Sequence, residues 1–466
     1  MTAPVATGRV LPTLNQDGTR NWIRPKPAPG MWWHRRRIVA YALMVLFFAI
    51  PHIRINGMPA ILLDLPQRHF TILGTTFLPT DTLLLMLLLG SIVVAIFLFS
   101  ALFGRVWCGW ACPQTVYMEF IFRPLERLLE GGRSGSLKID KTHGHFHPRR
   151  LLKYAVYLVI ALFLAHTFLA YFVGVDKLET WVRLSPYEHL TPFLVMAATT
   201  ALIFFDFTYF REQTCLIACP YGRWQSALLD NESLIVAYDP ERGEPRQRGV
   251  KDRPSTAGDC VMCNACVTTC PTGIDIRNGL QMECIHCTQC IDACDAIMDQ
   301  VGKPRGLIRY ASRDQLAGKP RHLLRPRVIL YPAALSIFLG GFVFALGTRA
   351  KADVMLMRGV GSEPFTVEQD GRVANQIRVK IANRSLRDHE YAISILGADS
   401  AQVIAPESPL PVASGDQRTT SVFVILPSSA FTAGQRNVKV HITSGSDYSQ
   451  DFSFNLLGPN TTGQTQ

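Results

Sequence analysis

The pattern of apolar positions divides the chain into a part that resembles a membrane protein and a strand-rich carboxyl-terminal part. Uncharged stretches of 21 to 23 residues are long enough to cross ~30 Å of hydrocarbon as helices. A shorter uncharged stretch at 38–53 follows an aromatic and basic run, so we expect a retained anchor there. We predict an α-helical membrane bundle of about five spans, at 38–53, 82–104, 154–175, 190–210 and 328–348.

Residues 351–460 follow a different rule, because apolar and polar residues alternate there. Thr420–Leu426 and Asn437–Ile442 are two such segments, and turn signals such as Asp370-Gly371 separate the segments. About seven short strands predict an all-β sandwich of the immunoglobulin-like kind. The segment holds no cysteine, so no disulfide joins its sheets. An interaction module and a simple solubility cap both remain open as its role.

The positions of the basic residues give an orientation for these elements. The chain carries a net charge of +11, and Lys and Arg concentrate in 105–153 and 211–327, with nine and sixteen respectively. The loops at 54–81 and 176–189 have two each. Because basic loops stay in the cytoplasm, the amino terminus and 211–327 are expected inside, and the carboxyl terminus outside. The charge is thereby explained without nucleic acid.

These expectations give a multidomain layout. It consists of a cytoplasmic tail at 1–37, a membrane domain with four spans at 38–220, a cytoplasmic insert at 221–327, a fifth span at 328–348 and a periplasmic sandwich at 351–460.

Eight cysteines in the insert form two copies of one spacing. Both runs, Cys260–Cys270 and Cys284–Cys294, have two, two and three residues between their cysteines, the pattern of bacterial ferredoxins with two [4Fe–4S] clusters. In that pattern the fourth cysteine of each run ligates the other cluster. Two zinc sites or four disulfides fit this spacing poorly. We therefore predict cluster 1 at Cys260, Cys263, Cys266 and Cys294, and cluster 2 at Cys284, Cys287, Cys290 and Cys270.

A second set of four cysteines lies at the ends of two predicted spans. Two Cys-x3-Cys-Pro motifs supply Cys108, Cys112, Cys215 and Cys219, which we call the four-cysteine site. On a helix, positions i and i+4 share a face, and the following proline ends that helix or begins the next one. Repeated topology could bring the two motifs together. Cu(I) binding, another iron–sulfur centre, dithiol–disulfide cycling and inert packing all remain open.

Other polar residues are weaker candidates. His166 and Asp206 lie within predicted spans, where polar groups are costly and often functional. The run His143-x-His145-x-His147 is more typical of a solvated loop than of a metal site.

The chain resembles the FixG/RdxA/CcoG family of accessory proteins for cbb3-type cytochrome c oxidase. The motifs that carry this resemblance are the paired Cys-x3-Cys-Pro sequences, the double ferredoxin run with Cys270-Pro-Thr-Gly-Ile-Asp-Ile-Arg-Asn-Gly-Leu-Gln-Met-Glu-Cys284, and the terminal sandwich. Membership implies a bacterial inner-membrane protein that reduces Cu(II) to Cu(I) for oxidase assembly. It also implies that the four-cysteine site is catalytic and handles copper, with copper carriers, assembly factors and a cytoplasmic electron donor as partners.

Two other functions are open. A quinol-oxidising membrane ferredoxin that feeds a respiratory reductase shares the Cys-x3-Cys-Pro pairs and would need a quinone pocket, for which His166 is a candidate. A non-enzymatic assembly scaffold would carry its clusters for structural reasons alone.

Overall fold

The computed structural model forms two compact units. It describes residues 9–15, 17–55, 57–66, 68–78, 81–142, 147–249, 254–320, 325–359, 363–385 and 387–460. Unit 1 contains Met1–Ile53 and Thr82–Phe342, and unit 2 contains Arg54–Asp81 and Val343–Gln466.

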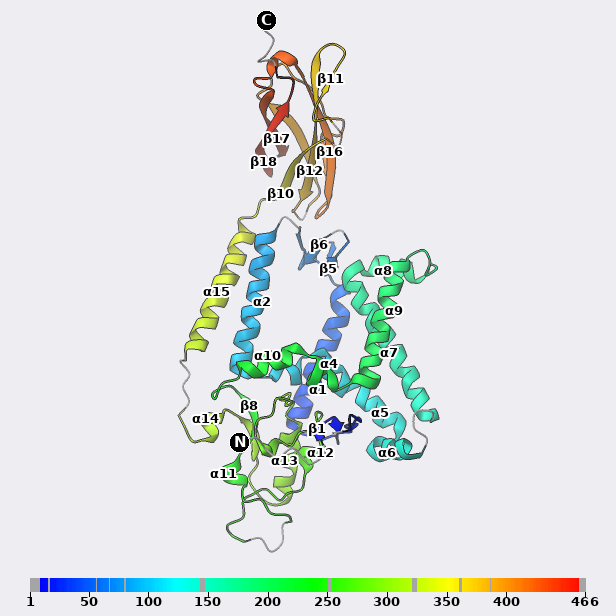
Figure 1. Ribbon diagram of the computed structural model, residues 1–466, viewed down its shortest axis with the longest axis vertical. Coiled ribbons are helices and arrows are strands. Elements are labelled where there is room, and N and C mark those ends of the chain that lie inside the picture. Colours follow the sequence, from blue (N-terminus) through cyan, green and yellow to red (C-terminus); the bar gives the residue numbers. More distant parts are fainter. Residues whose placement is uncertain are drawn as a thin grey trace. The chain divides into compact units, whose positions relative to one another are not determined.

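Four long helices of the described residues have the length and composition of membrane spans. They are α2 (Thr82–Phe103), α7 (Pro148–Val173), α9 (Leu190–Phe205, continued by the π-helical turn η4, Asp206–Phe210) and α15 (Pro326–Gly347). α15 packs along α2, and α9 packs along α7 (Figure 1). None of the residues of α15 is buried. Apolar side chains that face outward in this way are suited to a lipid environment.

The first predicted span is a helix, but it differs from the prediction. α1 runs from Met31 to Ala49 and so begins seven residues before position 38. Three arginines, Arg35 to Arg37, lie in its first two turns, and it is not among the four apolar helices. Asp292 accepts hydrogen bonds from the backbone N–H groups of Trp32 and Trp33, at 3.1 and 2.6 Å. A carboxylate in this position satisfies unpaired amides at a helix start, which explains why the helix begins here.

Short helices connect these long ones and carry a buried charge network. They are α3 (Val106–Trp110), α4 (Pro113–Tyr117), the π-helix η2 (Met118–Phe122), α5 (Arg123–Glu130), α6 (Gly132–Thr142), α8 (Val175–Val182), the π-helix η5 (Thr214–Ala218) and α10 (Pro220–Leu228). Both carboxylate oxygens of Glu126 accept from Arg211 at 3.0 Å, and Lys153 lies 3.5 Å from the same carboxylate. Glu130 binds Arg150 at 3.2 Å. Several of the basic residues counted in the sequence are therefore structural.

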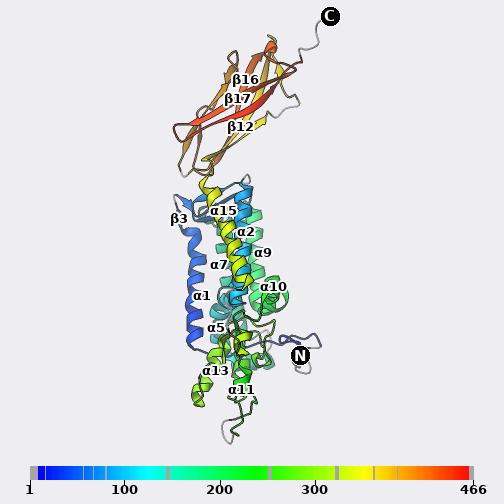
Figure 2. The same ribbon diagram turned by 90° about the vertical axis from the view of Figure 1, so that its left-hand side faces the viewer.

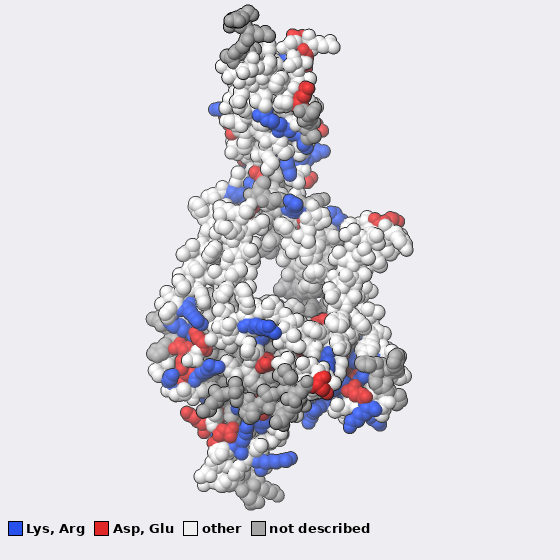
Figure 3. Space-filling view, viewed as in Figure 1, with Lys and Arg blue, Asp and Glu red and all other residues white. Residues whose placement is uncertain are grey.

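The cysteine-rich insert folds as a small α+β element within unit 1. Strand β8 (Ile235–Tyr238) pairs antiparallel with β9 (Ile308–Ala311), and between them lie α11 (Pro240–Gly243), α12 (Ala265–Thr268), the 3-10 turn η6 (Ile276–Asn278) and α13 (Gln289–Gln300). α14 (Arg313–Leu316) follows β9. α1 begins beside α13 (Figure 2). On the face shown in Figure 3, charged side chains are sparse over the long helices and more frequent over the insert and over the short helices α5 and α6.

Unit 2 is a β-sandwich, as predicted. One sheet has the order β10-β12-β16-β14 with β11 paired to β12, and the other has the order β15-β13-β17-β18. The strands are β10 (Ala352–Arg358), β11 (Thr366–Val367), β12 (Arg372–Asn383), β13 (His389–Leu396), β14 (Gln402–Ile404), β15 (Leu410–Val412), β16 (Gln417–Pro427), β17 (Gln435–Ser444) and β18 (Tyr448–Leu457). Fully buried apolar residues such as Ile377, Val424 and Val440 form one core between the sheets.

Residues Arg54–Asp81 form part of unit 2, whereas the sequence had assigned them to the membrane domain. They contain the strand pairs β3 (Arg54–Ile55) with β4 (Met58–Pro59), and the sheet β5 (Ile61–Asp64), β6 (His69–Ile72) and β7 (Thr75–Phe77). The carboxylate of Asp81 binds Arg349 and, at 2.7 Å, Arg384. A further short pair, β1 (Arg9–Leu11) with β2 (Leu14–Asn15), precedes α1.

Candidate functional site

The two cysteine runs of the insert have the same loop conformation. Met262 and Asn264 in the first run, and His286 and Thr288 in the second, all have φ between 52° and 63°. Such left-handed conformations are uncommon for residues other than glycine, and they persist where the surroundings require them. Each loop leads directly into a helix, α12 or α13. The repeated strained geometry shows that both loops curl in the same way around their cysteines.

The four cysteines predicted for cluster 1 line one pocket. Cys260, Cys263, Cys266 and Cys294 surround it together with Tyr238 and Arg277. Cys294 belongs to α13, so the second run contributes one thiol to the loop of the first. Cys263 is exposed, whereas Cys260 and Cys266 are buried. This pocket therefore has one edge open to solvent.

The four cysteines predicted for cluster 2 form a more deeply buried group. Burial raises the pKa of Cys284 to about 12, and the thiols of Cys287 and Cys270 contribute to the rise. Burial also raises the pKa of Cys290, with Cys287, Cys284 and Cys270 acting in the same direction. Buried thiols of this kind become thiolates only when a cation compensates the charge, as iron does in a cluster.

The two Cys-x3-Cys-Pro motifs converge in the structure. Cys108 and Cys215, one from each motif, pack in one cluster. Burial raises the pKa of Cys215 to about 12, and the thiols of Cys112, Cys108 and Cys219 add to the rise. Burial likewise raises the pKa of Cys108 to about 11. Cys112 and Cys219 are in extended conformations before Pro113 and Pro220, which begin α4 and α10. Proline disfavours a helical conformation in the residue before it, so one thiol of each motif lies outside its helix.

The cysteine groups do not form a ready-made site for a single metal ion. Among the residues that the structure describes, no group of three or more His, Cys, Asp or Glu side chains is gathered closely enough to hold one metal ion. In the cluster pattern each thiolate binds a different iron, so those sulfurs need not converge on one point. The roles of the twelve cysteines as ligands stay predictions.

The four-cysteine site lies directly against the second ferredoxin loop. Cys108 and Cys215 pack in one cluster with Ile285 and Cys287. A Cβ atom on Gly109 would lie 2.5 Å from the carbonyl oxygen of Ile285, so only glycine permits this approach. The thiol of Cys108 lies 3.0 Å from Oε1 of Gln225, which is fully buried. The structure therefore brings the first Cys-x3-Cys-Pro motif, at Cys108, against the loop of Cys287, which lies more than 170 residues later in the sequence.

Two buried side chains near cluster 2 have nitrogen atoms with no hydrogen-bond partner within the described part of the chain. Arg36 is fully buried, and its Nη1 and Nη2 atoms form no hydrogen bond. His286 is also fully buried; its Nδ1 accepts from the backbone N–H of Arg105 at 3.1 Å, and its Nε2 has no partner. Unpaired buried donors are costly and call for an acceptor. An anionic iron–sulfur cluster held by Cys287 and its neighbours fits this requirement.

Sequence reasoning missed Arg36, Gln225 and the charge network. Arg36 lay in a run of three arginines, which we interpreted as a membrane anchor. No pattern separates the buried arginine of such a run from its exposed neighbours. Gln225 follows the second Cys-Pro by a few residues, and a polar residue there gave no distinct signal.

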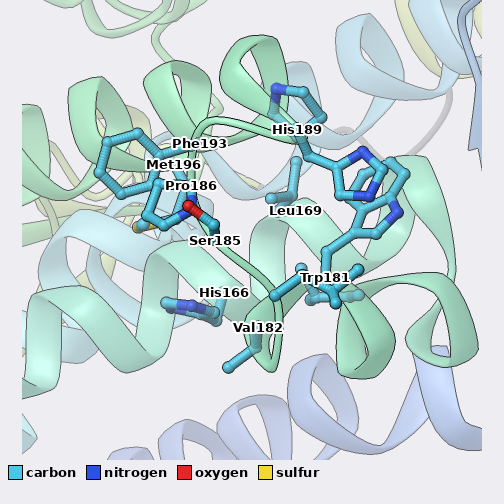
Figure 4. Close-up of a pocket in the computed structure, with 12 residues that line it drawn as sticks. His166, Leu169, Trp181, Val182, Ser185, Pro186, His189, Phe193 and Met196 are labelled. Carbon is cyan, nitrogen blue, oxygen red and sulfur yellow. The ribbon is translucent and has the colours of Figure 1, made fainter.

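His166 lies in a separate pocket, at the ends of α7 and α9 that adjoin α8 (Figure 4). Trp181, His189 and Met196 are among its lining residues, and no cysteine lines it. Nδ1 of His166 lies 2.8 Å from the carbonyl oxygen of Leu162, one turn earlier in the same helix. The structure does not bring His166 to the four-cysteine site. Of the histidine run, His143 and His145 lie outside the described residues.

Comparisons with known proteins agree with this arrangement. Residues 210–313 match a family model described as a 4Fe-4S dicluster domain, and residues 342–459 match one described as an IG-like fold at the C-terminal of FixG. Residues 85–131 match a model described as a 4Fe-4S binding domain. That segment includes Cys108 and Cys112 and holds no other cysteine.

Two curated relatives cover most of the chain. The nitrogen fixation protein FixG of Rhizobium meliloti (strain 1021) is 31% identical, over 94% of this chain and 93% of that protein. Protein RdxB of Cereibacter sphaeroides is 34% identical, over 87% and 89%. A crystal structure of a FixG-related protein from Vibrio parahaemolyticus covers 24% of this chain and 98% of that one, at 13% identity and a TM-score of 0.21. With its four apolar helices, its 4Fe-4S domains and its terminal sandwich, this chain belongs to the FixG/RdxA family of iron–sulfur membrane proteins.

Proposed function

We propose that this protein reduces Cu(II) to Cu(I) at the four-cysteine site and so supports the assembly of a cbb3-type cytochrome c oxidase. The observation that carries the proposal is the packing of Cys108 and Cys215 against Ile285 and Cys287. It places a thiol-rich site in contact with the loop of an iron–sulfur centre. When bound, the two [4Fe–4S] clusters supply one-electron storage and transfer.

The chain's own residues give this transfer a direction. The loop of cluster 1 exposes Cys263 and Met262, so an electron carrier in solution can approach there. The loop of cluster 2 is buried and meets the four-cysteine site through Gly109. Electrons are thus expected to enter at the exposed loop and leave at the buried one.

The four-cysteine site suits the product of the reaction better than the substrate. Cu(II) prefers nitrogen and oxygen ligands, whereas Cu(I) prefers soft sulfur, so reduction favours transfer of the ion to thiolates. One electron converts Cu(II) to Cu(I), and each thiol that binds the ion releases its proton. Because burial raises the pKa values of Cys108 and Cys215, these thiols stay protonated until a cation arrives.

The proposed location is the bacterial inner membrane, with the insert in the cytoplasm and unit 2 in the periplasm. Basic residues are abundant beside the insert and scarce in 54–81, in agreement with the positive-inside rule. Because Arg54–Asp81 and the sandwich form one compact unit, the proposed topology includes a crossing by α1 as well. Its 19 residues span about 28 Å at 1.5 Å per residue, with the arginines at its cytoplasmic end. Copper carriers, oxidase assembly factors and a cytoplasmic electron donor are the proposed partners.

Steady-state copper reduction tests the proposal. Purified protein with intact clusters receives an excess of reductant and Cu(II) under anaerobic conditions, and a chelator reports Cu(I). The double variant C108S/C215S is expected to lose most of this activity while it keeps the cluster absorbance. Equal rates of Cu(I) formation in the wild type and in C108S/C215S would show that the four-cysteine site takes no part in copper reduction.

A second candidate, oxidation of a quinol, is favoured by one observation. A cavity of about 440 Å³ between α1, α4, α7 and α9 is lined by apolar residues with a few polar groups, Gln114, Tyr117 and Thr199. Ala111 and Pro113, on either side of Cys112, form part of its wall. Its size and lining are typical of small-molecule sites. Reduction of the clusters by a short-chain quinol, with no reoxidation by Cu(II), would favour this function over copper reduction.

A further inference from the structure

Arg36 is a buried cation between the four-cysteine site and cluster 2. It lies in the second turn of α1, and its Nε donates to the carbonyl oxygen of Gly109 at 2.9 Å. Gly109 separates Cys108 from Cys112 and touches the backbone of Cys287. Arg36 thus reaches the point where the two sites meet.

Among the residues that the structure describes, none forms a direct ion pair with Arg36. Within the described part of the chain, Nη1 and Nη2 have no hydrogen-bond partner, and the guanidinium lies 5.5 Å from the ring of Phe120. The nearby carboxylate of Glu119 is engaged by Arg123 and by Nε2 of Gln289. The carboxylate of Asp292 accepts from the start of α1. The charge of Arg36 also stabilises these two carboxylates, and it lies next to Gly109, which touches the backbone of Cys287.

A cation at this place has an electrostatic consequence at Cys287. A cation that favours a thiolate also favours the extra negative charge of a reduced cluster, because both are anionic states in a low-dielectric site.

The corresponding cation of cluster 1 is neutralised. Arg277 lines the cluster 1 pocket, but its Nη2 and Nε bind the carboxylate of Asp275 at 2.6 and 2.8 Å. At the equivalent loop position, cluster 2 has the buried His286 and cluster 1 has the exposed Met262. The two loops share a backbone conformation, yet their electrostatic surroundings differ.

We propose that Arg36 is a positioning residue that holds the reduction potential of cluster 2 above that of cluster 1, so that electrons are drawn toward the four-cysteine site. This inference rests on the proposed function, because it explains what drives electrons from cluster 1 to cluster 2. Arg36 acts through its unpaired charge and its hydrogen-bond donors, and it takes no part in copper binding.

Redox titration of the full-length protein, followed by electron paramagnetic resonance without copper, tests the inference. Cys263→Ser identifies the signal of cluster 1, because it changes an exposed ligand of that cluster alone. Arg36→Gln removes the charge, and Arg36→Lys retains it. Arg277→Gln serves as the matched control beside cluster 1.

We expect Arg36→Gln to shift the electron-exchange equilibrium between the clusters at least tenfold toward cluster 1, which for a one-electron couple is about 59 mV. Arg36→Lys should recover most of the shift, and Arg277→Gln should move the potential of cluster 1 instead. The inference is overturned if Arg36→Gln leaves the reduction potential of cluster 2 unchanged, or if it shifts the potentials of both clusters equally. A wild-type protein in which cluster 2 has the lower reduction potential of the two clusters also overturns the inference. This measurement needs no variant, so it decides the matter even if Arg36→Gln loses its clusters. Copper reduction is measured separately, so a failure there does not affect this result.

Discussion

Gly109→Ala tests whether close approach of the two sites governs electron transfer. The added Cβ would lie 2.5 Å from the oxygen of Ile285 and 2.9 Å from the N and Cα atoms of Cys287. All three are backbone atoms, so a change of side-chain rotamer cannot relieve the clash. Ordinary contact begins at 3.4 Å, and the difference from 2.5 Å requires a displacement of about 0.9 Å.

The size of this displacement determines how much stability and electron-transfer rate the variant should lose. Overpacking of a tight contact costs about 1–3 kcal/mol, and a misplacement of about 1 Å at a reacting site can lower a rate roughly 100-fold. Alanine is the better helix former by about 1 kcal/mol, so helix propensity in α3 acts in the opposite direction. We expect the transfer rate to fall by about 10- to 100-fold with both clusters retained.

Rapid anaerobic mixing of reduced protein with Cu(II), followed by cluster absorbance, measures this rate. Gly340→Ala in α15 is the matched control, because a Cβ there meets nothing within 4 Å. A Gly109→Ala protein that transfers electrons as fast as the wild type and the control would refute the reasoning. A fall in Gly340→Ala as well would point to a general effect of the substitution.

Two further predictions concern buried charges. Asp81→Ala removes the carboxylate shared by Arg349 and Arg384 and should destabilise unit 2 by about 3–5 kcal/mol in thermal unfolding. Asp447→Ala breaks an exposed pair with Lys351 and should leave the melting temperature nearly unchanged. Equal losses in the two variants would contradict the assignment. For Glu126, burial raises the pKa but the charges of Arg211 and Lys153 lower it more, so the net pKa lies below 4.5. This contribution to stability is present above pH 4.5 and is lost as the pH falls through the lower folded value. Glu126→Gln should lower the melting temperature near neutral pH and weaken its acid dependence, and an unchanged dependence would count against the network.

The sequence predicted those features that repeat or that depend on length. Apolar length identified α2, α7, α9 and α15, since an uncharged helix of that size has few alternatives. Alternation predicted the sandwich of unit 2 because side chains of a strand face opposite sides. The spacing of the cysteines predicted the ferredoxin insert, and the match of 210–313 to a 4Fe-4S dicluster domain agrees with it.

Features that depend on contacts between distant residues could not be predicted in this way. Arg54–Asp81 joins unit 2 through Asp81, whose partners Arg349 and Arg384 lie 268 and 303 residues later in the chain. Arg36 looks like its neighbours Arg35 and Arg37, and only packing against Gly109 buries it. The convergence of the two Cys-x3-Cys-Pro motifs was anticipated from repeated topology, but their contact with the second ferredoxin loop was not.

The stoichiometry of electron transfer to copper tests the central claim most directly. Reduced protein is titrated anaerobically with Cu(II), and the resonance signals of the clusters and of Cu(II) are measured in the same samples. One reduced cluster should be oxidised for each Cu(II) that disappears, until both clusters are oxidised. Reduced clusters that persist beside an undiminished Cu(II) signal would contradict the account.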